Sequence, residues 1–192
     1  MSAPQLFQLL SRLKTTPRTG WVHHGVKNPE SIADHMYRLA MLCLMFPDPN
    51  LNHELMLHIA LVHDIGESIT GDFTPSDPIS KEEKRQLETE AIDRIQHLLT
   101  EMNPHLSLSV KELWLDYEYQ RNQEAMLVKQ MDKFEMLLQA DEYEQQQGGM
   151  DLDEFFQTST TAKITHPILV SWLNDLQHRR SERKQQQQPQ QE

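Results

Sequence analysis

The chain has 192 residues, of which 38% are hydrophobic, and a formal net charge of −11 at pH 7. This length predicts a single domain, and the acidic balance excludes a general nucleic-acid-binding surface, which needs a basic footprint. The longest apolar stretch, LAMLCLMF (39–46), is too short to span a membrane, and no signal peptide opens the chain. We therefore expect a cytoplasmic protein, with the nucleus left open as a second location.

Helix signals dominate the first quarter of the chain, whereas strand signals are weak throughout. Leucines at helical spacing predict a first helix over 4–14, followed by a connection over 15–28 that contains threonine, proline and glycine. Asn28 and Pro29 then predict the cap and first residue of a second helix. That helix is expected to end before Pro47.

The segment 53–67 is apolar nearly all round, a pattern typical of a buried central helix. A loop is predicted over 68–80. Ser80 and Glu83 form a capping box that predicts a helix to about residue 100.

Ser109 and Glu112 have the same spacing and predict the start of another helix. Further helices are expected at about 123–146, 151–158 and 167–183. The sequence therefore predicts an all-α, single-domain helical bundle over residues 1–183. The Gln-rich segment 184–192 has low complexity and is predicted to be a disordered tail.

One short stretch, LVHDIGE (61–67), combines an apolar helix with ionisable residues. His63 and Asp64 are adjacent, Glu67 follows one turn later, and Asp72 comes soon after. Buried together without compensation, the carboxylates would repel one another and raise each other's pKa. A divalent cation resolves this conflict, because carboxylate and neutral imidazole are its natural ligands.

His35 and Asp132 are ambiguous when each is considered alone. Both lie at the edge of the apolar stripe of a predicted helix. A hydrogen-bonded core histidine and an exposed helix aspartate are the ordinary explanations for such residues. Helical geometry by itself therefore leaves both the structural and the metal-ligand interpretation open.

The ordered set of motifs resembles the HD-domain metal-dependent phosphohydrolase superfamily and, within it, the eukaryotic HD domain-containing protein 2 family of 5′-deoxynucleotidases. The order H…HD…D is given by His35, His63-Asp64 and Asp132 on successive helices. The matching segments are PRTGWV (17–22), PESIADHMYRLA (29–40), IALVHDIGESITGD (59–72), KEEKRQLE (81–88) and VKQMDKFEMLLQADEYE (128–144).

The resemblance implies an HD-type helical bundle, a homodimer, and a metal-dependent phosphoric monoester hydrolase. The expected substrates are deoxyribonucleoside 5′-monophosphates. No nucleic-acid polymer and no membrane are expected as partners. The metal ligands of the family map onto His35, His63, Asp64 and Asp132. The expected cofactor is a divalent metal, Mn²⁺, Co²⁺, Mg²⁺ or Fe²⁺.

The resemblance also assigns roles around the metal. Glu67 and Asp72 map onto catalytic acidic positions, which can also hold a second cation together with the Phe73 carbonyl. Arg18 and Trp21 map onto residues that contact phosphate and sugar. In related bacterial enzymes these two are adjacent, whereas here two residues separate them, so an alternative role for Trp21 is to pin the loop to the helices.

Two other functions remain open from the sequence. One is an HD phosphohydrolase acting on a different nucleotide, such as a cyclic dinucleotide or guanosine tetraphosphate; the short segment 68–80 disfavours a large ligand. The other is a non-catalytic, metal-binding HD interaction module. A purely structural metal site would need neither Arg18 nor the two additional carboxylates, Glu67 and Asp72.

Overall fold

The computed structural model describes residues 3–187, which form two compact units, one ending at Val128 and one beginning at Lys129. Apart from an isolated bridge between Pro17 and Ser31, every regular element in these residues is helical, which confirms the all-α prediction. None of the described helices has the length and apolar character needed to cross a membrane. The boundary between the units falls within α8 (Gln123–Gln146).

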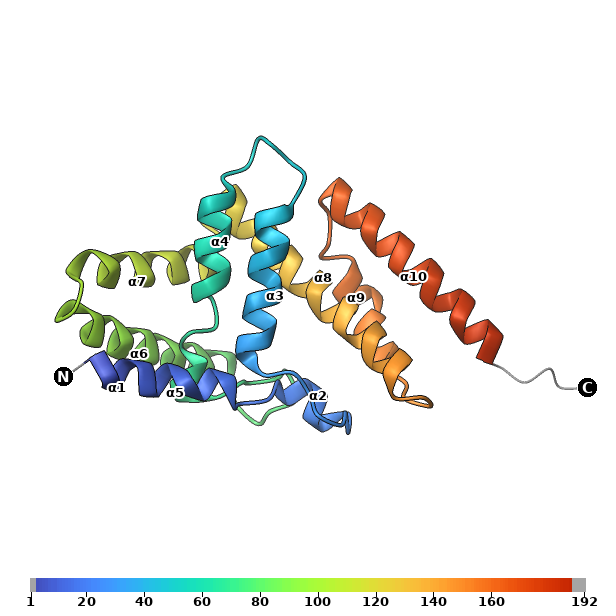
Figure 1. Ribbon diagram of the computed structural model, residues 1–192, viewed down its shortest axis with the longest axis horizontal. Coiled ribbons are helices and arrows are strands. Elements are labelled where there is room, and N and C mark those ends of the chain that lie inside the picture. Colours follow the sequence, from blue (N-terminus) through green and yellow to red (C-terminus); the bar gives the residue numbers. More distant parts are fainter. Residues whose placement is uncertain (1–2, 188–192) are drawn as a thin grey trace, which may run out of the picture. The chain divides into compact units, whose positions relative to one another are not determined.

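The first unit is built around helices that pair along the chain (Figure 1). α3 packs beside α4, α6 beside α7, and α4 also contacts α7. Its helices are α1 (Ala3–Leu10), α2 (Thr19–His23), α3 (Ile32–Met45), α4 (His53–Val62), α5 (Glu67–Thr70), α6 (Lys81–Thr100) and α7 (Pro104–Tyr119), with the 3-10 turn η1 (Ser11–Lys14) after α1.

Two apolar clusters lie in the core of the described part of this unit. The larger one joins Leu6 of α1, Val62 of α4, Ile95 of α6 and Trp114 of α7. The smaller one joins Leu13 of η1 to Ile32 and Met36 of α3. Both clusters contact Ile65, which lies in the turn after α4, so the backbone that carries His63 and Asp64 is held from two sides.

Several predicted helix boundaries are confirmed. The capping box of Ser80 and Glu83 begins α6, with each side chain bonded to the other residue's backbone N–H. The predicted helix 123–146 matches α8. Both helices carry strong local signals, a capping box in one case and a long apolar stripe ended by Gly148-Gly149 in the other.

Two predicted helix starts are wrong. Asn28 does not cap α3 but has φ of +52°, and the helix begins later behind a capping box of Ser31 and Asp34. Ser109 lies inside α7, where its hydroxyl donates to the His105 carbonyl, and the true cap is Asn103. In both cases the observed cap, Ser31 or Asn103, is a residue type that caps helices as readily as the predicted one, so residue type alone does not fix the start.

The predicted helix 53–67 is also divided. α4 ends at Val62, and residues 63–66 form tight turns in which Ile65 N–H donates to the Val62 carbonyl and Glu67 N–H to the Asp64 carbonyl. These bonds span three residues rather than four, so the chain changes direction here. The predicted connection 15–28 likewise contains the short helix α2, which the sequence did not indicate.

The second unit contains the rest of α8, η2 (Asp153–Phe156), α9 (Thr158–Thr161) and α10 (Pro167–Gln187). The short helix predicted at 151–158 is thus two separate turns. Residues 184–187 are helical, so the predicted tail boundary at 184 is four residues too early. Residues 188–192 lie outside the described residues.

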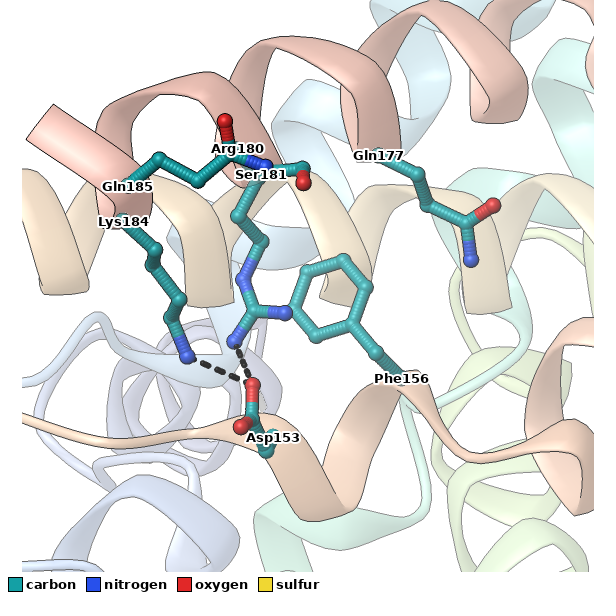
Figure 2. A pocket seen from close by; sticks show the side chains of 7 residues that line it. All are labelled: Asp153, Phe156, Gln177, Arg180, Ser181, Lys184 and Gln185. Carbon is teal, nitrogen blue, oxygen red and sulfur yellow. Dashed lines mark hydrogen bonds and ion pairs between the residues drawn. The ribbon is translucent and has the colours of Figure 1, made fainter.

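Ion pairs join α10 to the end of α8 and to η2. Arg180 donates through Nε and Nη2 to the two carboxylate oxygens of Glu144, at 2.7 and 2.6 Å, and it lies over the Phe156 ring. Figure 2 shows both Arg180 and Lys184 directed at Asp153. These residues line a pocket of about 440 Å³. We call Glu144, Asp153, Arg180 and Lys184 the α10 cluster.

Candidate functional site

The turn after α4 brings His63 and Asp64 together in the first unit. The His63 Nδ1 atom lies 2.9 Å from the Ala60 carbonyl oxygen, which can only accept, so Nδ1 carries the proton. The other ring nitrogen, Nε2, is therefore a lone-pair atom when the ring is neutral. It lies 3.0 Å from Oδ2 of Asp64, a second lone-pair atom. Two acceptors this close need a proton or a cation between them.

His35 reaches the same place from α3. Its side chain is buried, its Nε2 lies 3.9 Å from Asp64 Oδ2, and its ring meets the His63 ring edge-on at a centroid distance of 5.4 Å. The prediction that His35 lies with the HD doublet is thus consistent with the geometry of this unit. Two imidazoles and a carboxylate converging in a buried site form a donor set that fits a divalent cation.

Tyr117 of α7 packs against the far side of this arrangement. Its ring centroid lies 4.8 Å from that of His63, and it is buried. Together with the hydrogen bond at Nδ1, this contact fixes the orientation of the imidazole. Such support from a second layer of residues is what holds a metal-binding histidine in position.

The groups that surround Asp64 determine its protonation state. Burial by itself would raise the pKa of Asp64, but His63, His35 and Arg18 together lower this pKa to about 2. Arg18 contributes through Nη1, which lies 3.6 Å from Asp64 Oδ2. Asp64 is therefore ionised at neutral pH, as a metal ligand must be.

Glu67 opens α5 and has the opposite electrostatics. Burial, followed by the negative charges of Asp64 and Asp72, raises the pKa of Glu67 well above its usual value, and Arg18 and Lys84 offset only part of this. Its Oε2 atom is buried and has no hydrogen-bond partner among residues 3–187. Glu67 and Asp64 thus form a pair of neighbouring carboxyl groups whose pKa values are pushed apart, as in many acid–base sites.

Asp72 is tied to the 17–22 segment. Its Oδ2 accepts a hydrogen bond from the Thr19 backbone N–H at 2.6 Å, and its carbonyl oxygen accepts one from the Thr19 hydroxyl at 2.8 Å. The neighbouring Phe73 carbonyl oxygen accepts from Lys84 Nζ at 3.3 Å. A second cation held by Phe73 stays a prediction, and the ammonium group at this carbonyl counts against it.

Arg18 and Trp21 have different surroundings, although the sequence predicted that both contact substrate. Arg18 reaches Asp64, whereas the Trp21 side chain is buried, with only 2% of the residue exposed, and its indole N–H donates to Glu30 Oε1 at 2.9 Å. These contacts favour the alternative in which Trp21 pins the loop.

Asp132 belongs to the second unit, where it lies on α8 and is half-buried. Its role as a metal ligand therefore stays a prediction.

Sequence reasoning missed four residues that contact the site residues: Thr19, Glu30, Lys84 and Tyr117. Thr19 and Glu30 lie within the quoted motifs, but neither stands out by residue type or spacing. Their contacts join segments far apart in the chain, such as Thr19 to Asp72, and such contacts have no local signal.

The carboxylates of the second unit are a useful contrast. Glu144, Asp151 and Asp153 also present oxygen atoms within 4.8 Å of one another. Each of them already has an ion-pair partner in Arg180 or Lys184, however, so the geometry does not call for a cation here. The α10 cluster is therefore a structural set of ion pairs.

The chain is similar to known proteins in both sequence and fold. The sequence model of the HD domain family matches residues 10–169. The chain is 47% identical over 184 residues to the protein named 5′-deoxynucleotidase hdd1 of Schizosaccharomyces pombe, covering 95% of this chain and 92% of that relative. It is 44% identical over 177 residues to 5′-deoxynucleotidase HDDC2 of Homo sapiens, covering 92% and 85%.

A solved structure described as a conserved hypothetical protein from Pyrococcus furiosus has a TM-score of 0.70 to this chain at 31% identity, covering 94% of this chain and 99% of that one. The matched range 10–169 extends over helices of both units, so the prediction of one HD-type domain is confirmed. The chain therefore belongs to the HD domain family and, within it, to the HD domain-containing protein 2 family.

Proposed function

We propose that this protein is a metal-dependent 5′-deoxynucleotidase, which hydrolyses deoxyribonucleoside 5′-monophosphates to deoxynucleoside and inorganic phosphate. The relatives named 5′-deoxynucleotidase, 40–47% identical to this chain, support the reaction. The observation that carries the proposal is the pair of acceptor atoms, His63 Nε2 and Asp64 Oδ2, only 3.0 Å apart in a buried site.

The metal would be held by His35, His63 and Asp64, with Asp132 as the fourth protein ligand. Asp132 is supported by its place in the H…HD…D order, and the mixed nitrogen and oxygen donors suit Mn²⁺, Co²⁺, Fe²⁺ or Mg²⁺. When bound, such a cation supplies Lewis acidity toward the phosphate and a nucleophile at neutral pH.

Arg18 binds the substrate phosphate in this proposal. Phosphate-monoester hydrolysis has a very high uncatalysed barrier, and catalysis depends on positioning and on neutralising charge at the phosphoryl oxygens. A guanidinium can pair with two of these oxygens at once, which a lysine ammonium cannot do in the same geometry. The contact of Arg18 with Asp64 supports this role, because it places the guanidinium beside the proposed metal ligands.

Glu67 is the group that transfers a proton to or from the reacting oxygens in this proposal. Its raised pKa means that this buried carboxyl keeps its proton to a higher pH than an exposed glutamate does, and a nearby positive charge lowers that pKa again. It can then take a proton from the attacking water or give one to the leaving 5′-oxygen. Asp72, held by Thr19, keeps the second carboxylate charge close to Glu67 and supports the same step.

The test is phosphate release from a panel of deoxyribo- and ribonucleotides by metal-loaded protein. We expect release from deoxyribonucleoside monophosphates, and loss of this activity in Asp64→Ala. Activity confined to a cyclic dinucleotide or guanosine tetraphosphate would replace the proposed substrate. Absence of release from every nucleotide would leave the metal-binding interaction module.

We also propose that the protein forms a homodimer and acts in the cytoplasm. The dimer is supported by the resemblance to the HD domain-containing protein 2 family. Sedimentation equilibrium measures it directly, and a mass of 22.5 kDa at all concentrations would contradict it.

A further inference from the structure

The backbone of Glu30 is paired with the segment that carries Arg18. The Arg18 N–H donates to the Glu30 carbonyl at 3.0 Å, and the Ile32 N–H donates to the Thr16 carbonyl at the same distance. An isolated bridge joins Pro17 to Ser31 between them. The two short stretches are therefore held in a fixed register immediately before α2 and α3.

The side chains of Glu30 and Arg18 continue this pairing. Glu30 Oε1 lies 4.0 Å from Arg18 Nε and also accepts the Trp21 indole N–H at 2.9 Å. On the other edge of the guanidinium, Nη1 lies 3.6 Å from Asp64 Oδ2. Arg18 thus has one carboxylate at its Nε edge and one at its Nη1 end. The Glu30 side chain is only 9% exposed, so little water competes for these contacts.

We propose that Glu30 is a positioning residue that orients the Arg18 guanidinium for phosphate. This inference rests on the proposed function, in which Arg18 binds the substrate phosphate. A free arginine side chain samples many rotamers, and binding must restrict them at an entropic cost. Glu30 reduces this cost by restraining the Nε edge before substrate arrives, while Trp21 holds Glu30 itself.

The first variant is Glu30→Gln, which retains an oxygen that can accept the Trp21 indole N–H but loses the charge beside Arg18. We expect about tenfold lower kcat/KM for dAMP, expressed as a higher KM with little change in kcat, because ground-state and transition-state binding are weakened together. Calorimetry should show about tenfold weaker binding of inorganic phosphate to metal-loaded Glu30→Gln. Glu82→Gln, at an exposed position on α6, is the matched control and should leave both values unchanged.

The decisive measurement repeats Glu30→Gln in an Arg18→Lys background. Lysine keeps the positive charge, and therefore measurable activity, but has no Nε edge for Glu30 to hold. If Glu30 acts through Arg18, its substitution should then change phosphate affinity by less than about twofold. A residue that only stabilised the loop would have the same effect in both backgrounds.

Two results would overturn the proposal. The first is an equal effect of Glu30→Gln in the wild-type protein and in the Arg18→Lys variant. The second is unchanged or tighter phosphate binding by Glu30→Gln, because this would mean that Glu30 only competes with phosphate for Arg18. Phosphate calorimetry measures binding and needs no turnover. If the protein hydrolysed no deoxynucleotide, the proposed function would be refuted, but phosphate binding would still test the role of Glu30.

Discussion

Buried charge is handled differently in the two units. In the α10 cluster, Glu144 and Asp153 each meet Arg180 and Lys184, and the acids have lowered pKa values. In the first unit, Asp64 is ionised, whereas its neighbour Glu67 has a raised pKa and a buried oxygen without a hydrogen-bond partner among the described residues. We call His35, His63, Asp64 and Glu67 the site cluster.

This difference separates stabilising charges from functional ones. In the α10 cluster the fold supplies the compensating groups, so nothing further is needed from solution. In the site cluster the fold compensates the neighbouring carboxyl groups of Asp64 and Glu67 only in part, and an external divalent cation can supply the rest. Four predictions test this distinction, from the largest expected effect to the smallest.

Asp64→Ala should abolish phosphate release from deoxyribonucleoside monophosphates. We expect more than about a 100-fold loss, because removing even an outer-shell partner of a metal ligand costs 10–100-fold. Steady-state phosphate release measures it. Asp153→Ala removes the same side chain from the α10 cluster and is the control, with activity unchanged. Equal losses in the two variants would break the comparison.

Arg180→Met should destabilise the protein without altering the chemistry. Removing one partner from a buried ion pair costs about 3–5 kcal/mol, and here Glu144 loses its bidentate partner and keeps only the longer contacts with Lys184 and Arg183. Urea unfolding gives this value. Arg179→Met is the matched control on the same helix, where an exposed arginine should contribute less than about 0.5 kcal/mol. Similar values for the two arginines would contradict a structural role for the α10 cluster.

A divalent cation should stabilise the wild-type protein. At a free Mn²⁺ concentration of 100 times Kd, the free energy of unfolding should rise by about 2.7 kcal/mol. Thermal unfolding of chelator-treated and Mn²⁺-loaded protein measures the shift. Arg180→Met should keep it and His63→Ala should lose it. A shift that survives His63→Ala would place the cation among other carboxylates, such as Asp151 and Asp153.

Glu67→Gln should alter how the stability of metal-free protein depends on pH. The folded pKa of Glu67 lies above its ordinary value of 4.5, so the folded state binds more protons and wild-type stability falls as pH rises through this window. Glutamine cannot ionise. The variant should therefore match wild type in acid and exceed it at neutral pH in urea unfolding with chelator.

Glu83→Gln provides a control of opposite sign. The hydrogen bonds from Ser80 lower the pKa of Glu83, so its charged form stabilises the folded state above that pKa and loses this effect as pH falls. The difference between wild type and Glu83→Gln should therefore shrink in acid. If the free energy of unfolding had the same pH dependence in wild type and in Glu67→Gln, the ionised form of Glu67 would not be destabilised by its surroundings.

Local signals predicted much of the helical structure. The apolar stripe of α8 and the capping box of α6 each lie within a short stretch of chain, and both boundaries agree with the structure. The start of α3 was wrong because Asn28-Pro29 and Ser31 are competing caps, and pairing of Ile32 with Thr16 lies outside local sequence information. The break after Val62 was missed because no proline marks it, and Ile65 in the turn is held by two apolar clusters that form only on folding.

The part of the site that lies within one short stretch of chain was also predictable from the sequence. His63, Asp64 and Glu67 are close in sequence, so their proximity follows from the chain itself. Trp21 was assigned to the substrate by resemblance, but burial and the bond to Glu30 point to a role inside the loop. Glu30 has no signal of its own, since its contacts with Arg18 and Trp21 depend on the pairing of two stretches of chain.

The sequence by itself determined the all-α class, the family motifs and the crowding of acidic groups around His63. Only the tertiary structure decided which of the buried charges are compensated. Compensation depends on contacts between distant residues, such as Arg18 with Asp64 and Arg180 with Glu144. Periodicity and capping act over a few residues, whereas the electrostatic environment of a carboxylate is the sum over every group that folding brings near it.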